Sequence, residues 1–364
     1  MRPAEAAKQV SHPYRSSSRG PLTQRYAASF EGGPIANIYS RRSFISRVGL
    51  LGCALPLRAA AQRAQPRRVR RIGFLSGAVP TLITAFEEEL RKLEYVDGKN
   101  IVIEKRISRP NTSDTALHAA ELARMDLDLV VAAALPQALE VRKANPAMPM
   151  VIATCPGMVS NSFAKSLKHP GGIYTGIDEL PPGVTAKRLR LLKTAAPKVS
   201  RVALLSTTPG RGGHETQVAD AEAAAESLRL TVKTYRATTL NELETALANL
   251  ARDGMDGLVN FQGGLSLANR ELIVDFAAKN RLPAIYQSAF FVEAGGLMAW
   301  APDQEGQYRM AARYVSKILK GARPGDLPVS YPGRYYLTIK RSAARGLGLV
   351  LPRPLVAKAD RVLP

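Results

Sequence analysis

Short apolar runs alternate with amphipathic stretches along most of this chain, and the alternation occurs as two successive series. The runs at residues 71–76 and 201–206 are rich in apolar residues, and each begins one series. Runs of this kind are typical of strands buried on both faces of a parallel sheet. The stretches between them repeat apolar residues every three to four positions, which is the period of an α-helix. The pattern therefore predicts an α/β protein with two doubly wound parallel-sheet lobes joined by a multi-strand hinge.

The predicted strands and helices follow this alternation along the chain. In the first series we expect strands at 71–76, 101–103, 128–134, 150–154 and 173–177, and helices at 81–93, 116–124 and from Pro136. In the second we expect strands at 201–206, 231–235, 257–261 and 284–286, and helices at 215–228, 240–250 and 267–280. The two series join near 178–183; a third piece crosses back at 295–303, continues into a helix at 304–319, and ends with an extended segment at 334–339 and a short helix. These boundaries predict one lobe from 70–178 plus about 301–325, and a second lobe, with hinge segments, from 179–300 plus about 330–364.

The first 61 residues predict an export signal. Arg41 and Arg42 precede an apolar run at 48–57, and the small residues 59–61 follow it. A charged region, a short apolar region and an A-x-A end are typical of a secretory signal, and the arginine pair indicates twin-arginine export. We therefore expect a disordered extension at 1–39, cleavage near Ala61 and a periplasmic mature protein, with the true start codon left open.

Two alternatives to cleavage remain for this segment. The apolar run is about ten residues long, whereas a helix that spans a bilayer needs about 20, which disfavours a membrane anchor. Residues 50–53 (Leu-Leu-Gly-Cys) resemble a lipidation box, so Cys53 could instead carry a lipid. With Cys53 in the signal, Cys155 is alone in the mature chain and no internal disulfide can form.

The net charge of +21 is unevenly distributed. Residues 1–71 carry +12, and the rest has 37 basic against 28 acidic residues, which is +9. The later charges are dispersed, without a basic block, aromatic–basic alternation or zinc-finger spacing. We therefore expect no binding of nucleic acid. The protein is separately expected to be a monomer.

Ligands of open parallel sheets bind at the carboxyl ends of the strands. Small residues follow the predicted strands in both series, where they allow a ligand to approach backbone N–H groups. Glycine and proline also simply mark turns, which is the structural alternative. We expect the ligand-binding residues to be Ser76, Gly77, Leu135, Cys155, Gly157, Gly210, Gln262, Gly263 and Trp300. For Trp300 and Tyr308, packing in the core or hinge is the alternative that we favour, and Asp303 is expected to cap the helix that follows it.

Signatures of catalysis are missing from the sequence. It has no G-x-G-x-x-G after a strand and no G-x-x-x-x-G-K-[ST], and His118, His169 and His214 lack metal-ligand spacing. Residues 264–268 come close to a nucleophile elbow, but no histidine follows His214, so Ser266 is predicted to be a helix N-cap. We expect no catalytic residue, no metal and no cofactor, and hence a binding protein in place of an enzyme.

Several segments together resemble a known family. They are 71–77, 166–172 (SLKHPGG), 280–286 (NRLPAIY), 291–298 (FVEAGGLM), 318–329 (ILKGARPGDLPV) and 346–352 (GLGLVLP). Their order and spacing resemble the ABC transporter substrate-binding proteins of the tryptophan/tyrosine type over residues 41–363. The resemblance implies a type I periplasmic binding protein fold, whose two lobes close on a small carboxylate-bearing ligand and deliver it to a membrane permease with a cytoplasmic ATPase.

One departure from the family bears on the ligand. The family usually has an Asp-Pro-Val-Gly type sequence after the fourth strand, where this chain reads Cys-Pro-Gly-Met-Val at 155–159. Gly157 stands near the place of the aspartate, and the loop at 262–264 also lacks an acidic residue. The resemblance therefore leaves open an amino acid or an aromatic or organic acid as the ligand. A ligand-sensing module for a membrane partner and a secreted α/β enzyme are the alternative functions.

Overall fold

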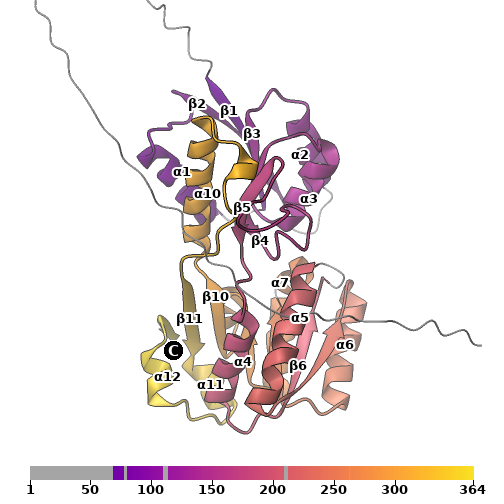
Figure 1. Ribbon diagram of the computed structural model, residues 1–364. Helices are drawn as coiled ribbons and strands as arrows, with labels where there is room; N and C mark the ends of the chain where they lie inside the picture. Colours follow the sequence, from indigo (N-terminus) through magenta and orange to yellow (C-terminus); the bar gives the residue numbers. More distant parts are fainter. Residues whose placement is uncertain (1–68, 78–79, 110–113, 209–211, 262) are drawn as a thin grey trace, which may run out of the picture. The chain divides into compact units, whose positions relative to one another are not determined.

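A computed structural model describes residues 69–77, 80–109, 114–208, 212–261 and 263–364 of the chain. The predicted signal at 1–61, including Cys53, lies outside the described residues, and so do Gly210 and Gln262. The described residues form two lobes, each built on its own sheet (Figure 1).

The first lobe is a five-stranded parallel sheet in the order β2-β1-β3-β4-β5. Its strands are β1 (Arg70–Gly77), β2 (Ile101–Ser108), β3 (Leu129–Ala132), β4 (Met150–Cys155) and β5 (Tyr174–Asp178). Its helices are α1 (Pro80–Lys92), α2 (Asp114–Ala123) and α3 (Leu135–Ala144). Side chains alternate along β1, so Phe74 packs in the core on one face and Leu75 in the core on the other. Burial on both faces explains why β3 and β4 read as continuous apolar runs.

The second lobe is a seven-stranded sheet in the order β12-β11-β10-β9-β8-β6-β7. Its strands are β6 (Arg201–Ser206), β7 (Thr231–Arg236), β8 (Gly257–Phe261), β9 (Ala284–Tyr286), β10 (Met298–Pro302), β11 (Tyr335–Lys340) and β12 (Arg361–Leu363). Its helices are α4 (Val184–Ala195), α5 (Gly212–Ala225), α6 (Leu240–Arg252), α7 (Gly264–Ala268), α8 (Arg270–Lys279), α9 (Ala289–Glu293), α11 (Arg341–Gly346) and α12 (Arg353–Ala357), with 3-10 turns at Glu226–Leu228 and Pro324–Asp326.

The long helix α10 (Gln304–Leu319) belongs to the first lobe, although it directly follows a strand of the second. It packs beside α1 (Figure 1). Its Tyr308 lies in the core with a ring centroid 6.3 Å from that of Phe74. Arg313 of α10 also forms a 2.7 Å ion pair with Glu89 of α1. Asp303 accepts a hydrogen bond from the Gly306 N–H, which confirms it as the N-cap. The core position of Tyr308 was also predicted correctly.

The predicted fold class is confirmed, with three local corrections. β11 pairs with β10 in the antiparallel sense, because the chain returns from α10 in the reverse direction. The predicted helix at 267–280 is two helices, because Asn269 leaves helical geometry and its side chain bonds the Leu265 carbonyl. Ser266 is not an N-cap, since Gly263 occupies that position and donates its N–H to the Ser266 hydroxyl.

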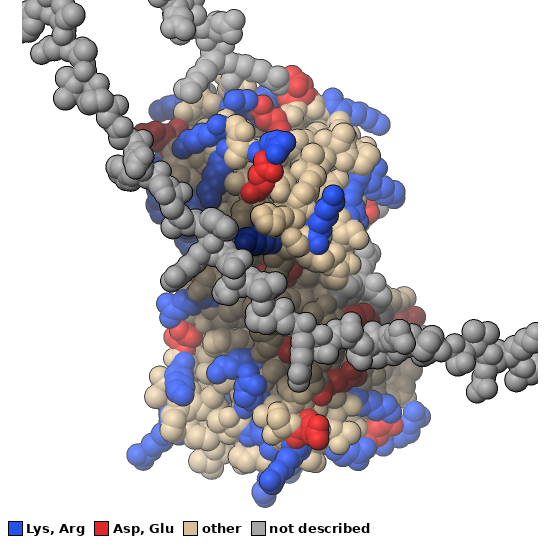
Figure 2. All heavy atoms as spheres, viewed as in Figure 1, with Lys and Arg blue, Asp and Glu red and all other residues tan. Residues whose placement is uncertain are grey.

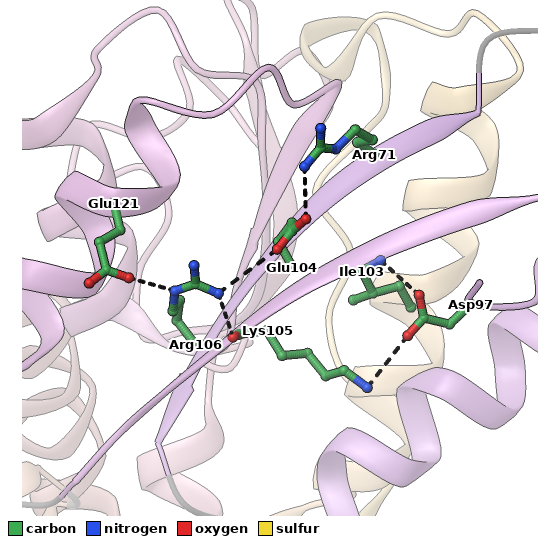
Figure 3. A network of polar contacts seen from close by, with 7 residues as sticks. All are labelled: Arg71, Asp97, Ile103, Glu104, Lys105, Arg106 and Glu121. Carbon is green, nitrogen blue, oxygen red and sulfur yellow. Dashed lines mark hydrogen bonds and ion pairs between the residues drawn. The ribbon is translucent and has the colours of Figure 1, made fainter.

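The edge strand β2 carries charged side chains that form a network of ion pairs (Figure 3). Glu104 bonds Arg71 of β1 at 2.8 Å and lies 4.0 Å from Arg106, which in turn bonds Glu121 of α2 at 2.6 Å. Lys105 pairs with Asp97 at 3.7 Å. Charges on an edge strand disfavour pairing with the strands of another chain, so this network protects the open edge of the sheet.

Charged side chains of both signs are dispersed over the described surface. On the face seen in Figure 2, Lys and Arg are spread over both lobes, with Asp and Glu among them. Among the described residues, no helix is both long enough and apolar enough to cross a bilayer.

Candidate functional site

The carboxyl end of β1 supplies Ser76 and Gly77, as the sequence predicted for this loop. Ser76 is 2% exposed, and its hydroxyl donates to the Gly77 carbonyl at 2.9 Å. It also interacts with the phenol of Tyr308, whose pKa burial raises to about 12. A serine and a tyrosine from distant parts of the chain thus meet at this strand end.

The side chains of Leu135 and Cys155 are buried in the core of the first lobe. Burial and the nearby Asp178 carboxylate raise the pKa of the Cys155 thiol well above its usual value. The Cys155 carbonyl accepts a hydrogen bond from the Glu179 N–H at 2.9 Å. Both residues therefore shape the carboxyl edge of the sheet through their backbone and their packing.

Gly157 occupies a position that only glycine suits. Its φ is +85°, and a Cβ there would lie 2.3 Å from the Ser160 hydroxyl oxygen. Its N–H donates to Asp178, whose carboxylate also accepts from the N–H groups of Met158 and Leu180 at 2.8 and 3.0 Å. This backbone geometry gives a physical reason for glycine near the place where the family usually has an aspartate.

Pro156 and Gly213 bring the two lobes into direct contact. A Cβ on Gly213, near the start of α5, would lie 2.1 Å from the Pro156 carbonyl oxygen. The Cα of Gly213 is also 3.1 Å from where a Cβ on Gly157 would be. A loop at the carboxyl edge of the first sheet therefore meets the start of a helix in the second lobe with backbone against backbone.

Polar residues gather at the carboxyl ends of β6 and β8 in the second lobe. His214 is 2% exposed and lies between the hydroxyls of Ser206 and Thr208, 2.7 Å from the first and 2.6 Å from the second. A Cβ on Gly263 would lie 2.7 Å from the Thr207 hydroxyl oxygen, so Gly263 packs tightly here. These two contacts of His214 hold the loop after β6 in place. The described residues contain no cluster of side chains able to hold a metal ion.

Trp300 packs at the crossing between the lobes. Its ring stacks on Tyr335 of β11 with centroids 5.7 Å apart and contacts the core of the second lobe. Its backbone carbonyl accepts a hydrogen bond from Arg188 Nε at 3.1 Å. The prediction that Trp300 packs in the core or hinge is therefore confirmed.

A group of polar side chains that the sequence analysis did not identify lies between the lobes. This interlobe polar cluster consists of Glu179, Arg188, Gln217, Gln287, Gln307 and Tyr335. Gln307 Nε2 approaches the Glu179 carboxylate at 3.5 Å, and the Tyr335 hydroxyl donates to the Glu179 carbonyl at 2.7 Å. The amides of Gln217 and Gln287 are hydrogen-bonded to each other.

The cluster combines residues from strand ends and from helices. Glu179 directly follows β5 and Gln287 directly follows β9, so the strand-end rule could have found both. Arg188 and Gln217 lie within α4 and α5, where no sequence spacing distinguishes them from surface residues. Burial raises the pKa of Glu179 to about 7, with a smaller contribution from Asp178. The cluster therefore contains a carboxyl group that titrates near neutral pH.

A known protein family matches most of this chain. Residues 76–363 match the family model described as ABC transporter substrate binding protein. The chain belongs to this family. The resemblance inferred from the sequence is thereby confirmed.

Individual known proteins are similar to this chain over most of their length. A tyrosine-binding protein of Clostridioides difficile is 24% identical over 273 residues, which are 74% of this chain and 78% of the relative. The structure of an ABC domain from Streptococcus pneumoniae in complex with L-Trp has a TM-score of 0.73 and 25% identity, covering 81% of this chain and 99% of that one. A ligand-free, open substrate-binding protein of Clostridium difficile has a TM-score of 0.64 at 24% identity, again over 81% and 99%.

Glu179 predicts a pH dependence of stability. Its pKa rises from an ordinary 4.5 to about 7 on folding, so its stabilising contribution is complete below pH 4.5 and is lost as the pH rises through 7. Asp178, Arg188, Tyr308 and Tyr335 are the charged or titratable groups that face it. We expect the free energy of unfolding to fall between pH 5 and pH 8, and Glu179→Gln to remove on the order of 2 kcal/mol of that fall.

Urea denaturation of the wild type and the variant across this pH range checks the expectation. The exposed Glu305→Gln serves as the control, which should follow the wild-type profile. Parallel profiles for wild type and Glu179→Gln would contradict the assignment.

Proposed function

We propose that this chain is the solute receptor of an ABC importer. It closes its two lobes on a small carboxylate-bearing ligand, an amino acid or an aromatic or organic acid, and delivers it to an inner-membrane permease with a cytoplasmic ATPase. The observation that carries the proposal is the interlobe polar cluster, to which Glu179 and Gln307 contribute from one side and Arg188, Gln217 and Gln287 from the other. A ligand that contacts both sets of side chains favours the closed state over the open one.

The relatives support a ligand of this size and chemistry. One is named a tyrosine-binding protein, and another was solved in complex with L-Trp. Membership of the family also supports a permease partner and a role in binding, as distinct from catalysis.

Thermal shift of the full-length protein against amino acids, aromatic acids and organic acids tests the proposal. A ligand at 100 times its Kd adds about 2.7 kcal/mol to the free energy of unfolding. For a chain of this size the melting temperature should rise by roughly 3–5 °C. A panel without any stabilising compound would contradict a carboxylate-bearing ligand, and turnover of a stabilising compound would contradict a receptor.

The contact between Pro156 and Gly213 tests closure. Gly213→Ala places a methyl group against the Pro156 carbonyl, so it should hinder the approach of the lobes while leaving each lobe folded. We expect the Kd for the stabilising compound, measured by calorimetry, to rise at least about tenfold, which is roughly 1.4 kcal/mol. Gly264→Ala is the matched control, because a Cβ there meets no atom within 4 Å. Equal affinities for wild type and Gly213→Ala would argue against closure at this point.

We also propose that the protein works in the periplasm after twin-arginine export. The support is the sequence pattern at 41–61, with paired arginines, a short apolar run and an A-x-A end. The mature protein from a bacterial host should begin near Gln62, as measured by N-terminal sequencing of the periplasmic fraction. Replacement of Arg41 and Arg42 by lysine should retain the precursor in the cytoplasm. A mature chain that begins at a lipid-modified Cys53 would favour the lipoprotein alternative.

A further inference from the structure

The C-terminal part of the second lobe departs from the mixed charges found elsewhere in the chain. Residues 340–359 contain five basic residues and no acidic one. The five are Lys340, Arg341, Arg345, Arg353 and Lys358, and all except the half-buried Lys340 are exposed. The ion pairs of the described residues include Arg334 and Arg361 nearby in the sequence, but none of these five. The stretch therefore carries five cations without a carboxylate in contact with them.

The acidic groups closest in the sequence do not cancel this charge. Asp360 is bonded to Arg334 at 2.7 Å and accepts the Leu337 N–H at 2.8 Å. An oxygen of Pro364 accepts a hydrogen bond from the Ser342 hydroxyl at 2.8 Å. With Asp360 and a carboxylate at Pro364 counted as the two acidic groups, residues 340–364 have six basic residues against two, which is +4.

The same stretch projects one apolar side chain into solvent. Val350 is 94% exposed. The leucines beside it, Leu347, Leu349 and Leu351, pack against the core of the lobe. The Leu349 N–H also donates to the Ala344 carbonyl at 2.9 Å, which folds the loop back onto the end of α11. The leucines and this bond hold the loop, and Val350 stays in water.

The exposed residues of this stretch lie on the outer side of one core. Ala344 of α11 and Leu355 of α12 are buried in the same core that the leucines of the loop contact. The residues of both helices that point away from this core therefore share one surface. Arg341 and Arg345 are neighbours on it, because they are one helical turn apart on α11. This C-terminal basic surface consists of Arg341, Arg345, Val350, Arg353 and Lys358.

The C-terminal basic surface begins at the edge of the second sheet remote from the expected ligand. β11 runs antiparallel to β10, so it ends at the edge opposite to the carboxyl ends of β8, β9 and β10. The N–H of Lys340, at the end of β11, donates to the carbonyl of Leu297, just before β10, at 2.9 Å. A partner that contacts α11 therefore leaves the interlobe polar cluster free.

We propose that the C-terminal basic surface docks the protein on an anionic phospholipid membrane. Lipid phosphates attract the cations, and Val350 enters the boundary between headgroups and acyl chains, so charge and apolar contact act together. A single projecting valine fits a lipid surface better than a folded protein, because a protein interface has a closely packed apolar centre. The inference goes beyond the proposed function. A weak, reversible contact keeps the receptor in the layer where a permease lies, while its strand ends remain free to take up ligand.

Sedimentation with vesicles tests the proposal on the mature protein from the periplasmic fraction. Vesicles of phosphatidylglycerol mixed with phosphatidylcholine present an anionic surface, and vesicles of phosphatidylcholine alone lack it. Each basic residue near an anionic surface strengthens binding about fivefold. We therefore expect the triple variant Arg341→Gln, Arg345→Gln, Arg353→Gln to lower the partition coefficient on the anionic vesicles about a hundredfold. Equal binding of the wild type to both kinds of vesicle would overturn the proposal.

A second triple variant, Arg91→Gln, Lys99→Gln, Arg124→Gln, is the matched control. These residues are also exposed, but they lie in the first lobe. The control changes the net charge by the same amount and should bind within about twofold of the wild type, because distant charges are screened. Both variants keep the basic residues before residue 72, so the attraction of that segment is common to all proteins compared. Equal losses in the two triple variants would show attraction by net charge alone and would overturn the proposal.

The contact of Val350 with lipid has its own test. Val350→Ser removes apolar area from the tip of the loop and should lower the partition coefficient about three- to tenfold. Val159→Ser is the control, because Val159 is 43% exposed and lies in the first lobe. Equal partition coefficients for the two variants would overturn the insertion of Val350.

Ligand affinity separates this inference from the proposed function. All substituted positions are exposed, so each variant should keep the melting temperature and the ligand Kd of the wild type. Ligand binding without vesicle binding would overturn the inference alone, and vesicle binding without ligand binding would overturn the proposed function alone. Unchanged vesicle binding of the Arg341, Arg345 and Arg353 variant, together with weaker delivery to a reconstituted permease, would assign the surface to the permease and overturn the lipid assignment.

Discussion

The Asp178 carboxylate organises the region on which the rest of the site depends. It sits at the last position of β5 and gathers three backbone N–H groups, from Gly157, Met158 and Leu180. These bonds fix the loop after β4 and the start of the segment that leads into the second lobe. Burial raises the pKa of Asp178 in spite of these bonds. The loop carrying Pro156 and the position of Glu179 both follow from this one carboxylate.

Most of the fold could be predicted from the sequence, because buried parallel strands and amphipathic helices have distinct periods. The strands Arg201–Ser206, Gly257–Phe261 and Ala284–Tyr286 and the helix Gln304–Leu319 agree at both ends. The helix Val184–Ala195 was not predicted, because Lys187, Arg188 and Arg190 interrupt its apolar stripe. One of these three basic residues is buried, which a periodicity argument cannot detect, since it treats every arginine as a surface residue.

The site was less accessible to sequence reasoning than the fold. The strand-end rule directed attention to glycines and to Ser76, and the structure gives Gly157, Gly213 and Gly263 close backbone or side-chain contacts. The charged and amide side chains between the lobes come from separate helices and strand ends, so only the three-dimensional arrangement brings them together. Burial of these polar groups is tolerable where hydrogen bonds satisfy them.

The placement of α10 has a consequence for how the chain is synthesised. This helix covers one face of the first sheet, yet it is encoded after five of the seven strands of the second lobe. During synthesis, the apolar surface around Phe74 and Phe86 stays uncovered by α10 until residue 319 has left the ribosome. A chain that is interrupted before that residue would present this surface to chaperones and proteases. Incomplete molecules would therefore be recognised and degraded more readily than complete ones.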